Sequence, residues 1–357
     1  MTKFDKTNTK LNDIEIHYII GLGRSGTTLL LRELGKYKHV LSNPESLFVL
    51  DFLYVQNPSK IMSPKRISFF LERIFTIKTG RFVSLDIWSI DKNRLIESIK
   101  KHSNIRFIDL IKLIHLNSKF AQEKNIRTII DKNPPYTSHV EKLVKLDKKS
   151  KFVGIYRFYL DNIISRNKYR LDALNHPYYH ALTWCKYNEE LIGLKNTYKY
   201  KIHLVQYEKF VVKPEMHLSE IRSFLGIKND EQAIDNSNLE EIINGLKTDI
   251  EKEEFLKMHQ KAFQEIDKTS INKANVPFDS KHLNAIHWIC SKTSLKLKYD
   301  LVPHSKPTIA TQVQIQIFKL ILFFVESKHH LFYRSSHRTR KYLKFLLKPQ
   351  SIIFNKS

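Results

Sequence analysis

The sequence is poor in cysteine and lacks a long apolar run. Only Cys185 and Cys290 occur among 357 residues, and they lack the spacing of a metal site, which argues against a disulfide framework and favours a reduced compartment. No uninterrupted apolar run of about 18 residues is present, so no membrane-spanning helix is expected. The first residues are polar and do not resemble a secretory signal. We therefore expect a cytoplasmic protein.

Acidic residues are also scarce relative to basic ones. The chain has 36 Asp and Glu against 60 Lys and Arg, which gives a formal net charge of +24. Such a charge attracts an anionic partner, for example a polyanionic cofactor or an acidic acceptor. Nucleic acid is the usual alternative, but the sequence carries no motif of a nucleic-acid-binding fold, and no nucleic acid is expected as a partner.

One segment has the layout of a phosphate-binding loop. Residues 21–28 read Gly-Leu-Gly-Arg-Ser-Gly-Thr-Thr, between the apolar run 16–20 and three leucines at 29–31. A strand, a glycine turn and a helix start in this order place backbone N–H groups and a helix dipole around an anion. The residue after the last glycine is Thr27, whereas a nucleotide triphosphatase has Lys there. The segment therefore suits a phosphate-like anion but lacks the lysine that contacts the terminal phosphates of ATP.

Apolar runs alternate with helical patterns along the chain. Strands are expected at about 16–20, 40–41, 127–131, 152–156 and 202–207. Helices are expected at about 26–37, 137–146, 161–171, 177–195 and 214–225. The intervening stretch 46–125 is too long for a simple crossover and is expected to form a helical insertion. This alternation predicts an α/β fold with a parallel sheet flanked by helices.

Polar residues stand at or just beyond the ends of several of these strands. They are Arg24, Glu45, Lys132, Arg157 and Tyr207. Ligands of parallel α/β sheets bind beyond the carboxyl ends of the strands, so these residues are candidates for one site. The ordinary alternatives are a salt-bridged surface arginine at 157 and an acid at a helix start at 45.

In this order, the motifs resemble those of the P-loop-type sulfotransferases that use 3′-phosphoadenosine 5′-phosphosulfate (PAPS). Residues 24–28 resemble the loop that binds the 5′-phosphosulfate, and Arg157 with Ser165 resembles the pair that binds the 3′-phosphate. Residues 131–134 are similar to a Lys-x-Pro step of that family, and Tyr207 opens a segment similar to its Tyr-Glu-x-Leu-Val. The resemblance implies donor contacts from Arg24, Ser25, Gly26, Thr27, Thr28, Arg157, Ser165 and Tyr207.

The resemblance also implies a reaction. The family transfers a sulfuryl group to an acceptor hydroxyl by in-line displacement, releases adenosine 3′,5′-bisphosphate, and needs no metal. Glu45 lies where the family has its glutamate base, while Arg24 and Lys132 are candidates for stabilising the leaving phosphate. His39 is a competing base. Asp131 has two readings, a magnesium ligand or a buried partner of Lys132 or of the loop.

The sequence departs from the family pattern at several points. Phe158 and Tyr159 replace the usual Asp-Pro after the 3′-phosphate arginine, and no glycine-rich adenine motif is found near the C-terminus. The match is closer to the carbohydrate and tyrosyl-protein branches. Leu47 stands where the tyrosyl-protein branch has Arg, which weighs against a protein tyrosine acceptor. We expect the acceptor to be a saccharide or a glycolipid.

The chain is expected to divide into three parts: a flexible arm at 1–14, a sulfotransferase domain at 15–304 and a basic amphipathic extension at 305–357. The extension carries ten Lys or Arg against a single acid, Glu326. Such a helix either lies on an anionic membrane, here the inner face, or packs on the core or on a partner subunit. Two other functions stay open for the whole chain, a nucleotide-dependent kinase and a non-enzymatic basic binding protein.

Overall fold

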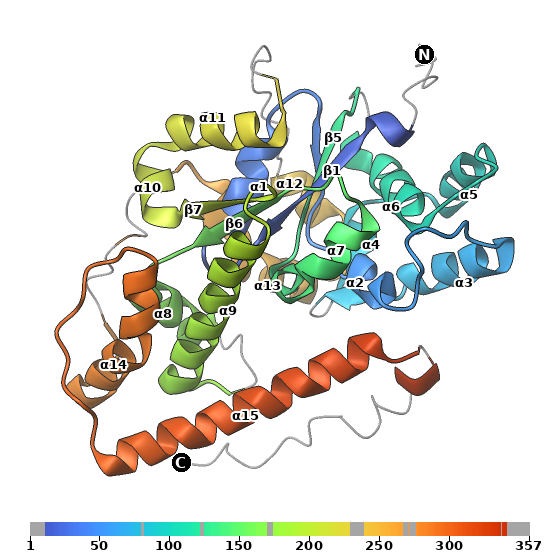
Figure 1. Ribbon diagram of the computed structural model, residues 1–357. Coiled ribbons are helices and arrows are strands. Elements are labelled where there is room, and N and C mark those ends of the chain that lie inside the picture. Colours follow the sequence, from blue (N-terminus) through green and yellow to red (C-terminus); the bar gives the residue numbers. More distant parts are fainter. Residues whose placement is uncertain are drawn as a thin grey trace.

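A computed structural model describes residues 11–79, 82–121, 125–169, 174–228, 239–266, 271, 276–336 and 338–340 (Figure 1). Within these residues, five parallel strands form a central sheet in the order β2-β5-β1-β6-β7. The strands are β1 (Glu15–Ile20), β2 (Val40–Ser42), β5 (Thr128–Lys132), β6 (Phe152–Tyr156) and β7 (Ile202–Gln206). This architecture confirms the α/β fold expected from the sequence.

Helices cover both faces of the sheet. On one face, α1 (Thr27–Gly35), α10 (Tyr207–Val212) and α11 (Pro214–Leu225) pack in one apolar cluster with strand residues such as Ile19 and Val153. Strand residues on the other face, such as Tyr18 and Phe152, pack with α2 (Phe48–Leu53), α6 (Phe107–Leu116) and α7 (Val140–Leu146). Neighbouring residues of a strand thus face two buried layers, which explains why the strands read as continuous apolar runs.

The remaining elements extend this core. Residues 46–125, expected to form a helical insertion, hold α2, α6 and a further group of elements. That group is α3 (Pro64–Ile74), β3 (Lys78–Thr79), β4 (Phe82–Val83), α4 (Ser84–Ile87), α5 (Lys92–Lys100) and η2 (Lys119–Ala121). The short antiparallel β3–β4 ribbon was not expected from the sequence. The rest are η1 (Leu11–Asp13), η3 (Pro134–His139), α8 (Tyr159–Tyr169), α9 (Pro177–Thr197), α12 (Leu239–Asn244), α13 (Asp249–His259), η4 (Gln260–Phe263), α14 (Ser280–Lys296) and α15 (Ile309–Arg334).

Two expectations differ from the structure. The helix expected at 137–146 is divided into the 3₁₀ turn η3 and then α7. Two prolines, Pro134 and Pro135, open this segment. Proline supplies no N–H donor for helical hydrogen bonds, which favours a tighter start. The end of the predicted arm 1–14 packs on the fold: Lys112 Nζ donates to the Leu11 carbonyl at 3.0 Å, and residues 1–10 lie outside the described residues.

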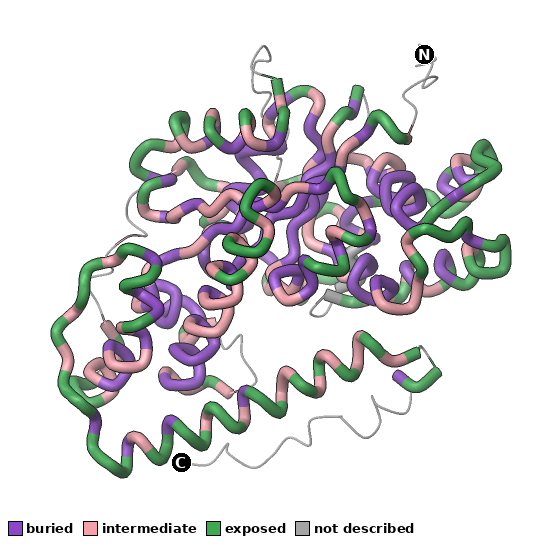
Figure 2. The backbone as a smooth tube through the Cα atoms, viewed as in Figure 1, coloured by how far each residue is buried: buried purple, intermediate pink, exposed green. Residues whose placement is uncertain are grey.

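The long helix α15 runs along one side of the molecule, beyond α9 and α2 (Figure 1). By length and composition it is apolar enough to cross a membrane, which the sequence did not lead us to expect because no uninterrupted apolar run reaches about 18 residues. Figure 2 shows exposed and less exposed residues alternating along it, so only part of its circumference packs on the body. Most of the basic stretch that follows, from 341 onward, lies outside the described residues.

Candidate active site

The turn between β1 and α1 has the backbone of an anion-binding loop. Gly21, Arg24 and Gly26 have positive φ angles of 135°, 72° and 96°, and the Ser25 N–H donates to the Leu22 carbonyl at 3.2 Å. A Cβ atom at Gly26 would lie 2.4 Å from the ring of Tyr207, so that position requires glycine. Gly26 caps α1 without a side-chain hydrogen bond, and the first N–H groups of a helix have no partner inside it. The start of α1 is therefore a suitable anion site.

Two arginines meet at this turn from different elements. Arg24 Nε donates to Ser165 Oγ at 3.0 Å, and its guanidinium lies 4.7 Å from the ring centre of Tyr169 on α8. Arg157, at the end of β6, donates to the Arg24 carbonyl at 3.4 Å, and its guanidinium lies 4.5 Å from the ring centre of Tyr207. The guanidinium of Arg157 thus points toward the loop, as a shared anion site requires.

Two details of this pair differ from the sequence-based expectation. Ser165, expected beside Arg157, contacts Arg24 in the structure. Arg157 also lies 3.7 Å from the buried carboxylate of Asp161, which offsets part of its charge. Burial lowers the pKa of Arg24, and the neighbouring cations Arg157 and Arg166 lower it further. Positive charge therefore accumulates around the loop, and a bound anion would relieve the repulsion.

Lys132 and Glu45 meet at the start of α1. Lys132 Nζ donates to Glu45 Oε2 at 2.5 Å and to Thr28 Oγ1 at 3.3 Å, and only 2% of Lys132 is exposed. The Glu45 side chain is 25% exposed, so it is accessible from solvent. Asn133 donates to the Ser46 carbonyl at 2.6 Å and holds the segment that carries Glu45. A carboxylate and an ammonium thus lie together beside the loop hydroxyls.

His39, the competing base, lies at the opposite edge of the sheet. It precedes β2, whereas Glu45 follows that strand. Its Nδ1 contacts the Asn125 carbonyl at 2.6 Å, and its own carbonyl accepts from the N–H groups of Arg127 and Thr128. Because parallel strands all begin at that edge, His39 is remote from the carboxyl ends where the other candidates gather.

Asp131 is a buried structural carboxyl group. Its Oδ2 accepts from the hydroxyl of Tyr136 at 2.6 Å, and 2% of the residue is exposed. Burial raises the pKa of Asp131 to about 7, and the nearby charge of Glu45 also raises it. The expected burial of Asp131 is confirmed, but its expected side-chain partner is wrong: Tyr136 donates to it, while the Lys132 ammonium contacts Glu45 and Thr28.

Four further residues at the site were not predicted from the sequence. Asn162 Nδ2 donates to the Gly23 carbonyl at 3.1 Å and to Ser25 Oγ at 3.0 Å, while Arg166 donates to the same carbonyl at 3.3 Å. Asn162, Arg166 and Tyr169 lie on one face of α8. Their helical spacing, at 162, 166 and 169, can be recognised in the sequence. The fourth is His259, at the end of α13.

His259 lies near the cations of the site. Burial lowers its pKa to about 3, and the charges of Lys132 and Arg24 contribute to the lowering. The turn η4 that follows packs on α1, where Arg32 donates to the Gln264 carbonyl at 2.5 Å. The segment that follows α13 therefore packs along α1. No sequence motif marks His259.

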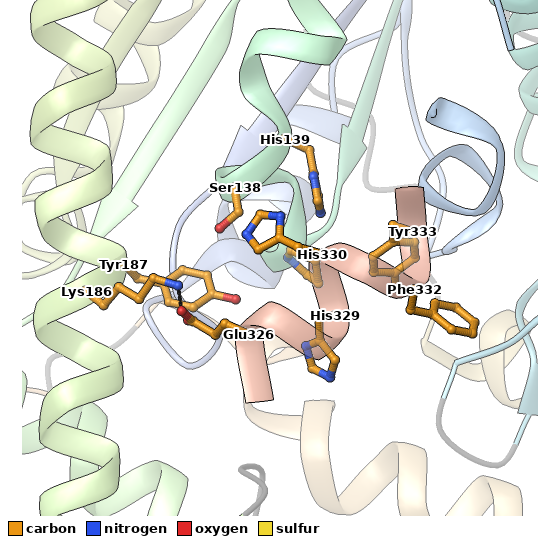
Figure 3. A pocket seen from close by; sticks show the side chains of 10 residues that line it. Ser138, His139, Lys186, Tyr187, Glu326, His329, His330, Phe332 and Tyr333 are labelled. Atoms are coloured by element: carbon orange, nitrogen blue, oxygen red, sulfur yellow. Dashed lines mark ion pairs between the residues drawn. The ribbon is translucent and has the colours of Figure 1, made fainter. Parts of the chain in front are cut away.

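A cavity of about 340 Å³ lies on the far side of η3 (Figure 3). One side of η3 contacts the loop, where Thr137 Oγ1 accepts from the Gly21 N–H at 2.9 Å. The cavity is lined by Pro135, Ser138, His139, Lys186, Tyr187, Glu326, His329, His330, Phe332 and Tyr333. Its lining combines aromatic and imidazole rings with an ion pair between Lys186 and Glu326, so it offers both flat apolar surfaces and polar partners.

Comparisons with known proteins agree with this fold. A family model described as "Sulfotransferase family" matches residues 18–231. The sulfotransferase domain of the Synechococcus PCC 7002 olefin synthase is 19% identical and has a TM-score of 0.50, with 81% of this chain and 97% of that chain covered. This likeness supports the fold.

Two further solved structures are more distant. The sulfotransferase domain of the curacin biosynthetic pathway is 19% identical with a TM-score of 0.45, covering 81% of this chain and 99% of that one. A sulfotransferase from Mycobacterium avium is 10% identical with a TM-score of 0.41, covering 82% and 79%. A search of curated proteins found no match.

Proposed function

The chain belongs to the sulfotransferase family and is an enzyme of that class, and on this premise we propose that its donor is PAPS and its acceptor a hydroxyl group. The observation that carries the proposal is the convergence of three buried or half-buried cations, Arg24, Lys132 and Arg157, on the start of α1. Such an arrangement suits a ligand with phosphate groups at two ends, because each end needs its own cation.

The donor is held at two points. Arg24, together with the hydroxyls and backbone of Ser25, Gly26, Thr27 and Thr28, would bind the 5′-phosphosulfate at the helix start. On the other side of the turn, Arg157 would bind the 3′-phosphate together with the Ser165 hydroxyl, which accepts from Arg24 Nε. The ring of Tyr207 lies under Arg157 and against Gly26, which fixes both groups.

Transfer then follows from the contacts of Glu45 and Lys132. Glu45 takes the proton of the acceptor hydroxyl as the acceptor oxygen forms a bond to sulfur and the bond from sulfur to the phosphate oxygen breaks. Lys132 and Arg24 stabilise the negative charge that develops on the departing phosphate. The 2.5 Å contact between Lys132 and Glu45 holds the base beside the loop before substrates bind.

We place the acceptor among saccharides and glycolipids. The ring-lined cavity behind η3 supports this, because aromatic faces pack on sugar rings while nearby polar groups bind hydroxyls. Residues 15–304 would form the sulfotransferase domain, and residues 305–357 an extension that contacts an anionic membrane. The enzyme would then act in the cytoplasm, bound peripherally at the inner membrane face.

The test is a transfer assay with donor labelled in the sulfuryl group. The purified chain is incubated with labelled PAPS and a panel of saccharides and glycolipids, and labelled products are separated. We expect transfer by the wild type and by Arg94→Ala, whose arginine is exposed on α5, and loss of transfer in Arg157→Ala. Magnesium-dependent turnover of ATP without use of PAPS would favour a kinase instead. If the chain binds a partner without transferring a sulfuryl group, and Arg24→Ala binds that partner as tightly as the wild type, a non-enzymatic role would be favoured.

A further inference from the structure

The outer face of α15 carries a continuous apolar stripe. Its members are Ile309, Val313, Ile317, Leu320, Phe323, Phe324 and Leu331, each at least half exposed. With 3.6 residues per turn these positions fall within roughly one third of the helix circumference. Scattered exposed apolar residues are normal on a protein surface, but a stripe along a 26-residue helix marks an interaction surface.

The opposite face fixes the helix on the body. Ile315 and Leu322 are buried with Tyr178 and Tyr179 of α9, and Phe318 stacks on His176 at 4.3 Å between ring centres. Toward its other end, the rings of His330 and Tyr333 contact His139, with 5.9 Å and 5.6 Å between ring centres. The helix therefore has a defined rotation about its axis, and the stripe faces outward because the body occupies the other side (Figures 1 and 2).

Beyond the last turn of α15, the chain returns to the body. Arg340 donates to Asp51 Oδ1 at 2.8 Å and to the Asp51 carbonyl at 2.6 Å, and 1% of Arg340 is exposed. Glu326, midway along the helix, pairs with Lys186 of α9. These two ion pairs lie on the body side of α15, so its single acid does not face outward with the stripe.

Basic residues border the stripe. By helical position, Lys319 lies along one edge and Lys328 along the other, while the exposed Arg334 and Arg338 follow at the end. Over 305–357 the sequence has ten Lys or Arg against one acid. If a second copy of the chain packed on the stripe, its basic residues would repel those of the first copy. An anionic lipid surface would instead attract these basic residues.

We propose that α15 lies flat in the headgroup region of an anionic membrane, with the stripe of seven apolar residues inserted and the bordering lysines at the phosphates. This places the cavity of Figure 3 next to the membrane, because the same helix lines it with His329, His330 and Tyr333. Resting on the proposed function, the inference narrows the acceptor to a saccharide carried on a lipid anchor.

The experiment is vesicle co-sedimentation of the full chain. Vesicles of phosphatidylcholine alone are compared with vesicles that contain about one third phosphatidylglycerol, for the wild type and the triple variant Leu320→Ser, Phe323→Ser, Phe324→Ser. We expect binding to anionic vesicles and at least a tenfold loss in the triple variant. A matched control replaces exposed apolar residues elsewhere, Ile61→Ser and Ile250→Ser, and should bind like the wild type.

Several outcomes would overturn the inference. They are equal binding by wild type and triple variant, no binding of the wild type to anionic vesicles, and resistance to alkaline carbonate extraction, which would indicate a spanning helix. A dimer that becomes monomeric in the triple variant, without vesicle binding, would assign the stripe to a second copy. The triple variant should retain binding of adenosine 3′,5′-bisphosphate and transfer to a soluble saccharide. Failure of those activities in the wild type would instead refute the proposed function.

Discussion

Two regions of the molecule differ in which side chains they bury: one buries charged groups, and the other exposes apolar groups. At the carboxyl edge of the sheet, Lys132 and Arg157 are charged yet only 2% and 6% exposed. Along α15, Phe323 and Phe324 are apolar yet 64% and 67% exposed. The two buried cations have carboxylate neighbours, Glu45 and Asp161, and a bound anion would add a further favourable contact. The exposed rings of α15 would be buried favourably against an apolar surface. The two regions therefore point to two different partners.

The regions also differ in how they are held. The loop at 21–28 is contacted by η3, by α8 and by Arg157, which directly follows β6; all three are distant from the loop in sequence. α15 contacts the body through one face. Changes at the site should therefore alter chemistry and leave membrane binding intact, and changes on the stripe should do the reverse. The following experiments test that separation.

Replacing the proposed base should have the largest effect. Glu45→Gln keeps the size of the side chain but cannot accept the acceptor proton, so kcat should fall about 10²–10⁴-fold. Steady-state assays with labelled donor measure this, and binding to anionic vesicles should stay at the wild-type level. A kcat within threefold of wild type, about 0.7 kcal/mol, would remove Glu45 from the mechanism.

Gly26→Ala should disrupt the loop itself. The added Cβ meets the Tyr207 ring at 2.4 Å and occupies a φ of 96°, so we expect a loss of about 2–4 kcal/mol in unfolding free energy. The matched control is Gly193→Ala on the exposed side of α9, where nothing lies within 4 Å and alanine should stabilise by up to about 1 kcal/mol. Urea unfolding measures both. Equal stability of the two variants would show that the loop tolerates a side chain at 26.

Asp131→Asn should change how stability depends on pH. Burial raises the pKa of folded Asp131 to about 7, from an ordinary value near 4. Between about pH 4 and pH 7 the folded state therefore binds more protons than the unfolded state. Its contribution to stability is present below about pH 4 and is lost as pH rises through 7. Relative to wild type, the variant should therefore gain about 1–3 kcal/mol between pH 5 and pH 8. Thermal unfolding at the two pH values checks this, and an unchanged difference would contradict it.

A single lysine at the stripe should have the smallest effect. Lys319→Gln removes one charge beside the membrane, worth about 1 kcal/mol, so vesicle affinity should fall about fivefold. Lys145→Gln, an exposed lysine on α7, should leave that affinity unchanged. Transfer to a soluble saccharide should be the same in both variants. A loss of transfer in Lys319→Gln would break the separation between the two regions.

Much of the sheet and part of the site were predictable from the sequence. The strand 152–156 and a helix start at about 26, observed at Thr27, follow from local patterns, namely apolar runs and a glycine turn. Arg24, Lys132 and Arg157 could be placed together because strand ends meet at one edge of a parallel sheet. These predictions needed only the order of elements along the chain.

Other features depend on contacts that local patterns do not encode. That Ser165 bonds to Arg24 is a matter of side-chain direction on α8. His259 reaches the site from a segment with no motif, because α13 and η4 fold back on α1. The outward face of α15 could be recognised only once Ile315 and Leu322 were seen packed on α9. Long-range packing decides each of these.

The most direct test of the account is calorimetric titration with adenosine 3′,5′-bisphosphate. We predict that the wild type and Arg94→Ala bind it with similar affinity, that Arg157→Ala loses about 100-fold, and that ATP binds more weakly than the bisphosphate. Equal affinity of wild type and Arg157→Ala, or binding of ATP alone, would contradict the claim that the loop and Arg157 hold the two phosphate ends of one donor.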